Sequence, residues 1–232
     1  MELSSRQPTV QKQGFGIPLL RFWQNHFSLW VHIGALLPLG ILVGRFFTGN
    51  LTVNPIQAAS QRTGDIALVM LLLSLACTPA ASILGIKEAI RYRRTLGLYA
   101  FFYAALHFLI FVGLDYTFRW DLIWETFVEK RFIVLGLIAG LILLALAVTS
   151  FDWWKKRLRK NWKRLHRLVY LAGGLVVIHY FWAVKAGVQL PLLAIWILLA
   201  LLLIRVPTVK ELLIDARYKL TRFFRSRNHS QY

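Results

Sequence analysis

The chain has 232 residues, of which 57% are hydrophobic, and it carries a formal net charge of +18. Its apolar runs of about twenty residues have the length that a helix needs to cross a bilayer, which argues against one large soluble core. The single cysteine, Cys77, excludes an internal disulfide and argues against zinc, iron–sulfur and covalently attached haem sites. Because the basic residues lie at the ends of the apolar runs, we do not expect nucleic acid as a partner.

The sequence predicts an all-α integral membrane protein, a bundle of six transmembrane helices. Residues 1–26 form a polar, basic N-terminal segment, with a short surface helix around Ile17–Trp23. The transmembrane domain covers residues 27–206, and a basic amphipathic tail covers residues 207–232. The expected spans are Phe27–Phe47, Ile66–Leu84, Leu96–Leu114, Phe132–Ser150, His166–Ala183 and Leu190–Ile204.

The segments between the spans differ in character. Thr48–Asp65 contains Gly, Asn and Pro and is expected to form a loop. Asp115–Arg131 mixes charged and aromatic residues, which predicts an interfacial loop or short helix whose rings lie at the level of the lipid headgroups. Phe151–Leu165 holds seven basic residues and one acid. Lys185–Gln189 is expected to be a tight turn.

The distribution of charge predicts the orientation of the bundle. With six spans, the two termini share one side with the segments at 85–95 and 151–165. That side holds 22 of the 28 basic residues, counting Arg167, but only 5 of the 10 acids. The positive-inside rule therefore places both termini in the cytoplasm. The same basic segments would also attract the anionic lipids of the bilayer.

Two histidines lie at matched depth in the third and fifth spans. His107 follows Arg94 by thirteen residues, and His179 follows His166 by thirteen. Both spans run in the same direction, so a rise of about 1.5 Å per residue brings His107 and His179 to similar depth. Ionisable groups inside an apolar span mark functional sites, and neutral imidazole ligates haem iron. The spacing predicts a bis-histidine b-type haem far from the basic side, whereas His32 has no matched partner and is interpreted as a packing residue.

His166 has no histidine opposite it at its own depth in the membrane. The third span carries Arg93 and Arg94 at that depth. Arginine stays protonated and is not expected to ligate iron, but its planar guanidinium can bind a haem propionate or a flavin phosphate. A second cofactor near His166 is therefore left open. On one ideal helix His166 and His179 would lie about 140° apart. Helix tilt, a kink at Gly173-Gly174 or different partner helices must account for that angle.

Several stretches of the chain resemble one membrane family, the haem-binding membrane subunits of the bacterial protein-methionine-sulfoxide reductase system (the MsrQ type), within the ferric-reductase-like transmembrane group. The resemblance covers the chain from about residue 50 to residue 185, in the same order. The stretches that carry it are NP at Asn54-Pro55, TGDIAL at Thr63–Leu68, LACTP at Leu75–Pro79, RRTLGLYAFFYAALHF at Arg93–Phe108, WKRLHRLVYLAG at Trp162–Gly173 and HYFW at His179–Trp182.

The resemblance implies b-type haem held by His107, His166 and His179, and FMN as a further cofactor. It implies a bacterial inner-membrane protein that takes electrons from a cytoplasmic flavin reductase or the quinol pool. It also implies delivery to a periplasmic molybdenum-containing subunit that reduces methionine sulfoxide in proteins, so that the chain is an electron-transfer subunit. Two alternatives stay open, a stand-alone membrane ferric or quinone-linked reductase and a haem-free membrane anchor.

Overall fold

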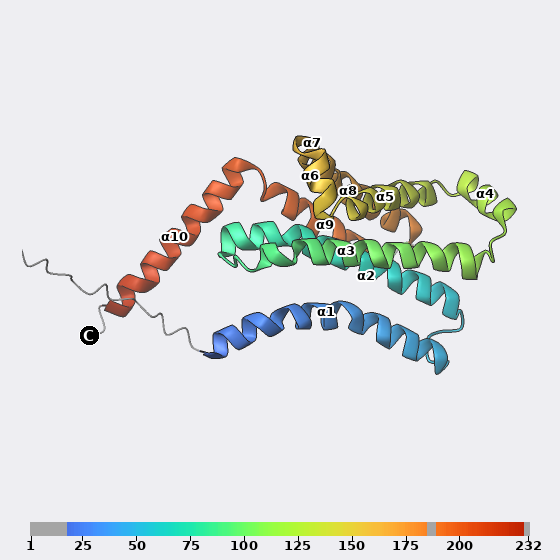
Figure 1. The fold of residues 1–232 in the computed structure, drawn as a ribbon, viewed down its shortest axis with the longest axis horizontal. Coiled ribbons are helices and arrows are strands. Elements are labelled where there is room, and N and C mark those ends of the chain that lie inside the picture. The colour runs from blue at the N-terminus through green and yellow to red at the C-terminus, as the bar shows by residue number, and fades with distance from the viewer. Residues whose placement is uncertain (1–17, 185–188, 230–232) are drawn as a thin grey trace, which may run out of the picture.

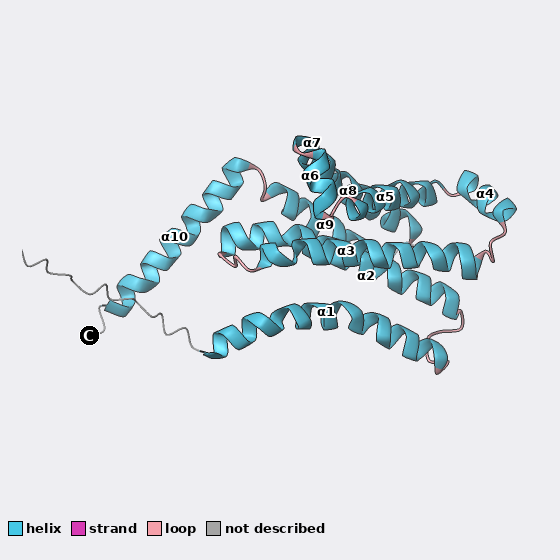
Figure 2. Cartoon of the chain, in the orientation of Figure 1, coloured by secondary structure: helices cyan, strands magenta, loops and turns pink. Residues whose placement is uncertain are grey.

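The computed structural model describes residues 18–184 and 189–229, and every regular element within these ranges is helical (Figure 2). Residues 1–17 of the N-terminal segment and residues 185–188 of the expected turn lie outside them. Figure 1 shows long helices running side by side, with the last helix leaving the bundle at one end. In chain order the helices are α1 (Pro18–Phe47), α2 (Pro55–Pro79), η1 (Ala80–Leu84), α3 (Ala89–Leu109), η2 (Ile110–Asp115), α4 (Trp120–Glu129), α5 (Arg131–Val148), α6 (Asp152–Leu158), α7 (Lys160–His166), α8 (Leu168–Ala183), α9 (Leu190–Leu203) and α10 (Pro207–His229).

Two helix pairs form the centre of the bundle. Helix α2 packs along α3, and α5 packs along α8, while α3 joins the two pairs through its contact with α5. Helix α9 covers α8 and α2, and α1 lies along α2 and α3 at the edge (Figure 1). The third and fifth expected spans therefore each lie within a central pair.

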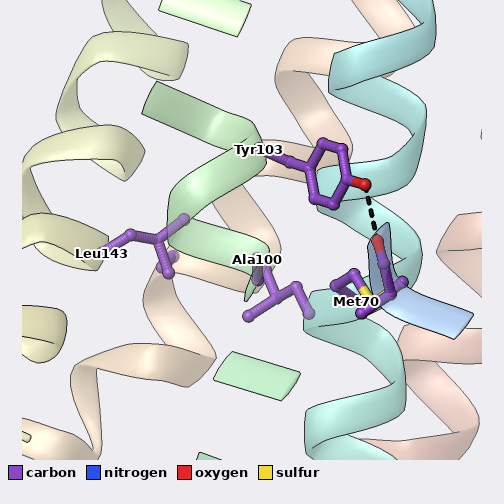
Figure 3. Packing of buried hydrophobic residues seen from close by; sticks show 7 residues of the cluster. Met70, Ala100, Tyr103 and Leu143 are labelled. Atoms are coloured by element: carbon purple, nitrogen blue, oxygen red, sulfur yellow. Dashed lines mark hydrogen bonds between the residues drawn. The ribbon is translucent and has the colours of Figure 1, made fainter. Parts of the chain in front are cut away.

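One buried cluster between these pairs is apolar apart from the hydroxyl of Tyr103. Met70, Ala100, Tyr103 and Leu143 belong to one buried cluster (Figure 3). The Tyr103 side chain is fully buried, and its hydroxyl donates to the carbonyl oxygen of Ala35 at 2.6 Å. Leaving such a group without a partner costs about 1–3 kcal/mol. The hydrogen bond therefore stabilises the packing of α1 on α3.

A second polar contact joins the same two helices. The Nδ1 atom of His32 lies 2.8 Å from the hydroxyl oxygen of Tyr99, and the two rings meet edge to face. This contact agrees with the interpretation of His32 as a packing histidine, since it fastens α1 to α3.

Five helical segments are long and apolar enough to cross a membrane, and a sixth span depends on how α9 is counted. Helix α9 has only 14 residues. It passes the same test only together with Pro207–Lys219 of α10, across a bend of 87°. The prediction of an all-helical transmembrane bundle is confirmed, with five or six candidate spans.

The expected loop at 48–65 is wrong beyond Asn54. The side chain of Asn54 accepts a hydrogen bond from the backbone N–H of Gln57 at 3.1 Å, and Pro55 occupies the first turn. Both are strong signals for a helix start, so α2 begins eleven residues before the expected Ile66. The polar side chains of its first turns had suggested a loop.

The basic segment and the fifth span also differ from expectation. The segment at 151–165 forms the two short helices α6 and α7, joined at Arg159, whose φ is +46°. Helix α7 ends at His166 and α8 begins at Leu168, so the interruption lies at Arg167. Gly173-Gly174 lie inside the continuous α8, which means that the angle between His166 and His179 does not arise from a break at the glycines.

The expected interfacial element is the short helix α4. Its Trp120 and Trp124 side chains are 66% and 74% exposed, whereas Ile123 and Thr126 are buried. The two exposed rings are four residues apart, about one helical turn, and Figure 1 shows α4 at the end of the bundle away from α10. This arrangement agrees with the predicted position at the headgroup level.

Candidate functional site

His107 of α3 and His179 of α8 lie next to each other within the bundle. The centroids of their imidazole rings are 6.3 Å apart, and the ring planes differ by 81°. The matched depth that the sequence predicts for these two histidines is therefore present in the structure, and it brings together two helices from different central pairs.

Each of these imidazoles is oriented by a backbone carbonyl. Nδ1 of His107 lies 2.7 Å from the carbonyl oxygen of Ser60, and Nδ1 of His179 lies 2.7 Å from that of Phe132. A carbonyl oxygen can only accept, so Nδ1 carries the proton in both rings. In the neutral tautomer the lone pair then lies on Nε2, the nitrogen available to a metal.

Two glycines allow the helices to approach the rings. A Cβ atom on Gly64 of α2 would stand 3.2 Å from Nδ1 of His107. On Gly136 of α5 it would stand 2.8 Å from Nδ1 and Cε1 of His179, closer than real Cβ contacts come. Gly136 therefore requires a residue without a side chain, and a Cβ at Gly64 would press the His107 ring outward by a few tenths of an ångström, because both imidazoles lie against the helix backbone.

The two histidines occupy equivalent places in a repeated arrangement. The acceptor carbonyl lies 47 residues before the histidine in both cases. The packed glycine lies 43 residues before it in both cases. The α2–α3 and α5–α8 pairs thus present one imidazole each in the same way, offset by 72 residues. The same offset relates Arg94 to His166, so an arginine stands where a histidine would complete a second pair.

The separation of the rings fits one iron atom between them. Two metal–imidazole bonds of about 2 Å, with each ring centre roughly 1 Å behind its nitrogen, place the centroids about 6 Å apart. No group of three His, Cys, Asp or Glu side chains in the described ranges converges as a protein-only metal site would require. A metal between His107 and His179 would take its other ligands from elsewhere, as haem iron takes them from porphyrin.

A cavity of about 570 Å³ lies at the other end of the same helices, beside His166. We call this end, formed by residues 85–95 and 151–167, the basic end. Five cations line the cavity with a single acid, Asp152, so its walls carry a strong positive charge. The size falls in the range of small-molecule and cofactor sites. The lining cations are Arg93, Arg94, Lys155, Lys163 and Arg167.

His166 is held differently from the other two histidines. Its Nε2 lies 3.2 Å from the hydroxyl oxygen of Thr149, which already donates to the carbonyl of Ala145 at 2.6 Å. The hydroxyl must therefore accept from Nε2–H, leaving the lone pair of the neutral ring on Nδ1. The indole of Trp162 stacks on the imidazole at 4.0 Å and donates to the Thr149 carbonyl at 2.8 Å.

The two arginines predicted to bind a cofactor both line this cavity. The half-buried guanidinium of Arg93 donates to the hydroxyl of Thr78 at 3.4 Å, and its backbone carbonyl accepts from Ser74 at 2.8 Å. The more exposed Arg94 lies over the ring of Phe151 at 5.9 Å. The structure thus brings Arg93, Arg94 and His166 to one cavity and keeps His107 and His179 apart from it.

Comparison with known proteins identifies the family. Residues 63–177 match the family described as "Ferric reductase like transmembrane component". Three relatives carry the name "Protein-methionine-sulfoxide reductase heme-binding subunit MsrQ". The one from Deinococcus radiodurans is 46% identical over 81% of this chain and 93% of its own length. Those from Rhodospirillum rubrum and Caulobacter vibrioides are 45% and 43% identical, over 78% and 76% of this chain and 88% and 84% of their own lengths.

The chain belongs to the MsrQ family. The resemblance drawn from the sequence motifs is therefore confirmed over most of the chain. The ferric-reductase match includes Arg93, Arg94, His107 and His166 and ends two residues before His179. The roles of these five residues as ligands or cofactor contacts stay predictions.

Several residues of both sites were not singled out from the sequence. The carbonyls of Ser60 and Phe132 carry no signal in their residue type, since any residue offers a carbonyl. Gly64 and Gly136 could have been recognised from the sequence, because each lies 43 residues before a histidine of a membrane span. Thr149 and Trp162 contact His166 across a helix break that hydropathy does not reveal.

Proposed function

We propose that the chain is a transmembrane b-type cytochrome that binds haem between His107 and His179 and passes electrons to a methionine-sulfoxide reductase. The observation that carries the proposal is the pair of adjacent imidazoles, 6.3 Å apart, whose Nδ1–H groups both donate to backbone carbonyls. That arrangement leaves both Nε2 atoms as ligands. The names of the similar MsrQ proteins, which call them haem-binding subunits, support the same cofactor.

The residues around His107 and His179 would orient the two imidazoles that bind the cofactor. The Ser60 and Phe132 carbonyls fix the tautomer of each imidazole and raise its basicity, as such partners do at other metal sites. Gly64 and Gly136 let the two rings pack against α2 and α5. Bound haem would supply a one-electron carrier in a setting of low polarity.

Electrons would enter at the basic end, which the charge distribution places in the cytoplasm. The cavity there fits a second cofactor with acidic groups, FMN or a further haem, held by Arg93, Arg94 and His166. A flavin reductase or the quinol pool is the proposed donor. The basic end and the His107–His179 pair lie at successive depths of α3 and α8, so electrons would cross the membrane along these helices.

The proposed acceptor is a periplasmic molybdenum-containing subunit that reduces methionine sulfoxide in proteins, with the chain in a bacterial inner membrane. The relatives are named as subunits of a protein-methionine-sulfoxide reductase. Membership of that family favours this acceptor over the alternative of a stand-alone ferric or quinone-linked reductase. The sulfoxide-reducing centre would lie on the partner.

Reconstitution tests the direction and the acceptor together. The purified chain would be inserted into liposomes that enclose the periplasmic reductase and methionine sulfoxide, and reduced flavin would be added to the vesicles in which the basic end faces outward. We expect haem reduction followed by chain-dependent loss of sulfoxide. Haem that is reduced but never reoxidised by the enclosed reductase and sulfoxide would contradict the proposed function.

A further inference from the structure

Arg205 is a cation inside the bundle that neither site described above includes. It follows the end of α9 at the bend into α10 and reaches between α2 and α8. One guanidinium nitrogen donates to the hydroxyl of Tyr170, and the other donates to the carbonyl oxygen of Leu75 at 2.6 Å. The guanidinium also lies 4.8 Å from the centre of the Tyr170 ring.

Part of this arrangement has a structural explanation. In α2 the carbonyl of Leu75 would normally accept from the N–H of the residue four positions on, which is Pro79 and has none. Neighbouring groups commonly satisfy carbonyls that proline frees in membrane helices. Arg205 does so here, so one of its hydrogen bonds serves the backbone of α2.

The charge of Arg205 is not explained by that contact. Its Nε atom is buried and has no hydrogen-bond partner among the described residues. A second cation lies near it, since the guanidinium of Arg93 donates to Thr78, on the same stretch of α2 as the Leu75 carbonyl that Arg205 contacts. No carboxylate of the described residues forms an ion pair with Arg205, and the ion pair between Arg119 and Asp121 lies in the segment that follows η2. A partly buried charge without a counter-charge is costly, so these two half-buried cations favour an anion beside them.

Tyr170 connects this charge to the cavity at the basic end. Its side chain lines the cavity together with Arg93. Its hydroxyl oxygen accepts from Arg205, which leaves the hydroxyl proton free to be donated to a further acceptor. A guanidinium behind a phenol makes the phenol a better donor to an anionic oxygen.

We propose that Arg205, through Tyr170, completes with Arg93 an anion site at the inner wall of the cavity, for the phosphate or carboxylate oxygens of a bound ligand. This inference rests on the proposed second cofactor, and a flavin phosphate and a haem propionate supply the same chemistry. Arg205 is a positioning residue in this site, since Tyr170 and Arg93 line the cavity.

Two pairs of probes separate the two sources of anionic oxygen. The full-length chain in detergent would be titrated with FMN and with riboflavin, which lacks the phosphate. It would then be titrated with haem and with haem dimethyl ester, which lacks the free carboxylates. Arg205→Gln should weaken the binding of FMN or of haem at the basic end at least about tenfold, the value of one charge-assisted hydrogen bond. Riboflavin and the ester should bind the wild type and the variant alike.

A second set of variants, made in a Pro79→Ala chain, distinguishes the anion site from the structural role of Arg205 at the Leu75 carbonyl. Pro79→Ala restores the N–H that Leu75 lacks, so a merely structural Arg205 becomes dispensable there. We expect Arg205→Gln to weaken anion binding as strongly in the Pro79→Ala chain, Arg205→Lys to retain part of the binding and Tyr170→Phe to reduce it. Wild-type affinity in Arg205→Gln, or a loss that disappears with Pro79→Ala, would overturn the proposal.

The low-spin spectrum of the His107–His179 pair is recorded in the same samples. A missing spectrum in the wild type would count against the proposed function, whereas an unchanged anion affinity in the variants counts against the site at Arg205.

Discussion

Gly136 of α5 lies directly against the imidazole of His179 of α8. A methyl group at this position would stand 2.8 Å from the ring's Nδ1 and Cε1. The ring is already held by its hydrogen bond to the Phe132 carbonyl, one turn earlier on the same helix. The glycine therefore sets how closely the histidine approaches α5 and, with it, where Nε2 lies relative to His107.

The first prediction concerns this contact. Gly136→Ala should displace the His179 ring and lower haem affinity about 10- to 100-fold, the range found when a group that orients a metal ligand is altered. Gly140→Ala, one turn further along α5, is the matched control, because a Cβ there meets nothing within 4 Å. Haem titration of the apo forms measures both variants. Equal affinity in the two variants would show that the close contact does not orient the ligand.

The second prediction concerns His166, which lies at the basic end beside Thr149 and Trp162. His166→Ala should slow reduction of the haem from the basic side while the spectrum of the His107–His179 pair persists, because the two sites are separate. Stopped-flow reduction by dithionite and by reduced flavin measures the rate. An unchanged rate with unchanged haem content would show that His166 is only an interfacial residue.

The third prediction distinguishes two uses of Arg93. If it serves only the positive-inside rule, Lys replaces it with little loss. If its planar guanidinium holds a phosphate or propionate, Arg93→Lys should weaken cofactor binding about tenfold in correctly inserted protein. Arg91→Lys is the matched control, since Arg91 lies half a turn earlier on α3 and does not line the cavity. Cofactor content and electron-transfer rate are the measurements.

The fourth prediction is the topology. In a Cys77→Ala background, single cysteines at Asn50 and Val53 should react with an impermeant reagent from outside the cell, and one at Asn161 should not. Gln61 falls in the loop expected at 48–65 but is unsuitable for labelling, since it lies within α2. Val53 is fully exposed in the connection between α1 and α2. The opposite labelling pattern would reverse the proposed direction of electron flow.

Much of this arrangement could be predicted from the sequence, because hydropathy and histidine spacing are local properties. The apolar runs correctly predicted five of the helical spans. The spacing of thirteen residues, from Arg94 to His107 and from His166 to His179, correctly predicted that the two histidines lie at one depth. The start of α2 at Pro55 was missed, because polar residues in its first turns obscured the capping signal of Asn54. The carbonyls of Ser60 and Phe132 could not be predicted, since they belong to the backbone.

The position of Arg205 could not be predicted from the sequence for a different reason. From the sequence alone, Arg205 is one more basic residue at the end of the last expected span. Its burial follows from the 87° bend after α9 and from the carbonyl that Pro79 frees on a distant helix. Such a contact joins residues 130 positions apart, and no local pattern encodes it.

The most direct test of the account is the visible and electron paramagnetic resonance spectrum of the purified full-length chain, expressed with ample haem. We predict a low-spin, b-type spectrum that His107→Ala and His179→Ala each largely abolish. His32→Ala should leave it unchanged, since His32 contacts Tyr99 on the outer side of the bundle. A colourless protein, or a low-spin signal that survives both His107→Ala and His179→Ala, would contradict the assignment of a haem to this pair.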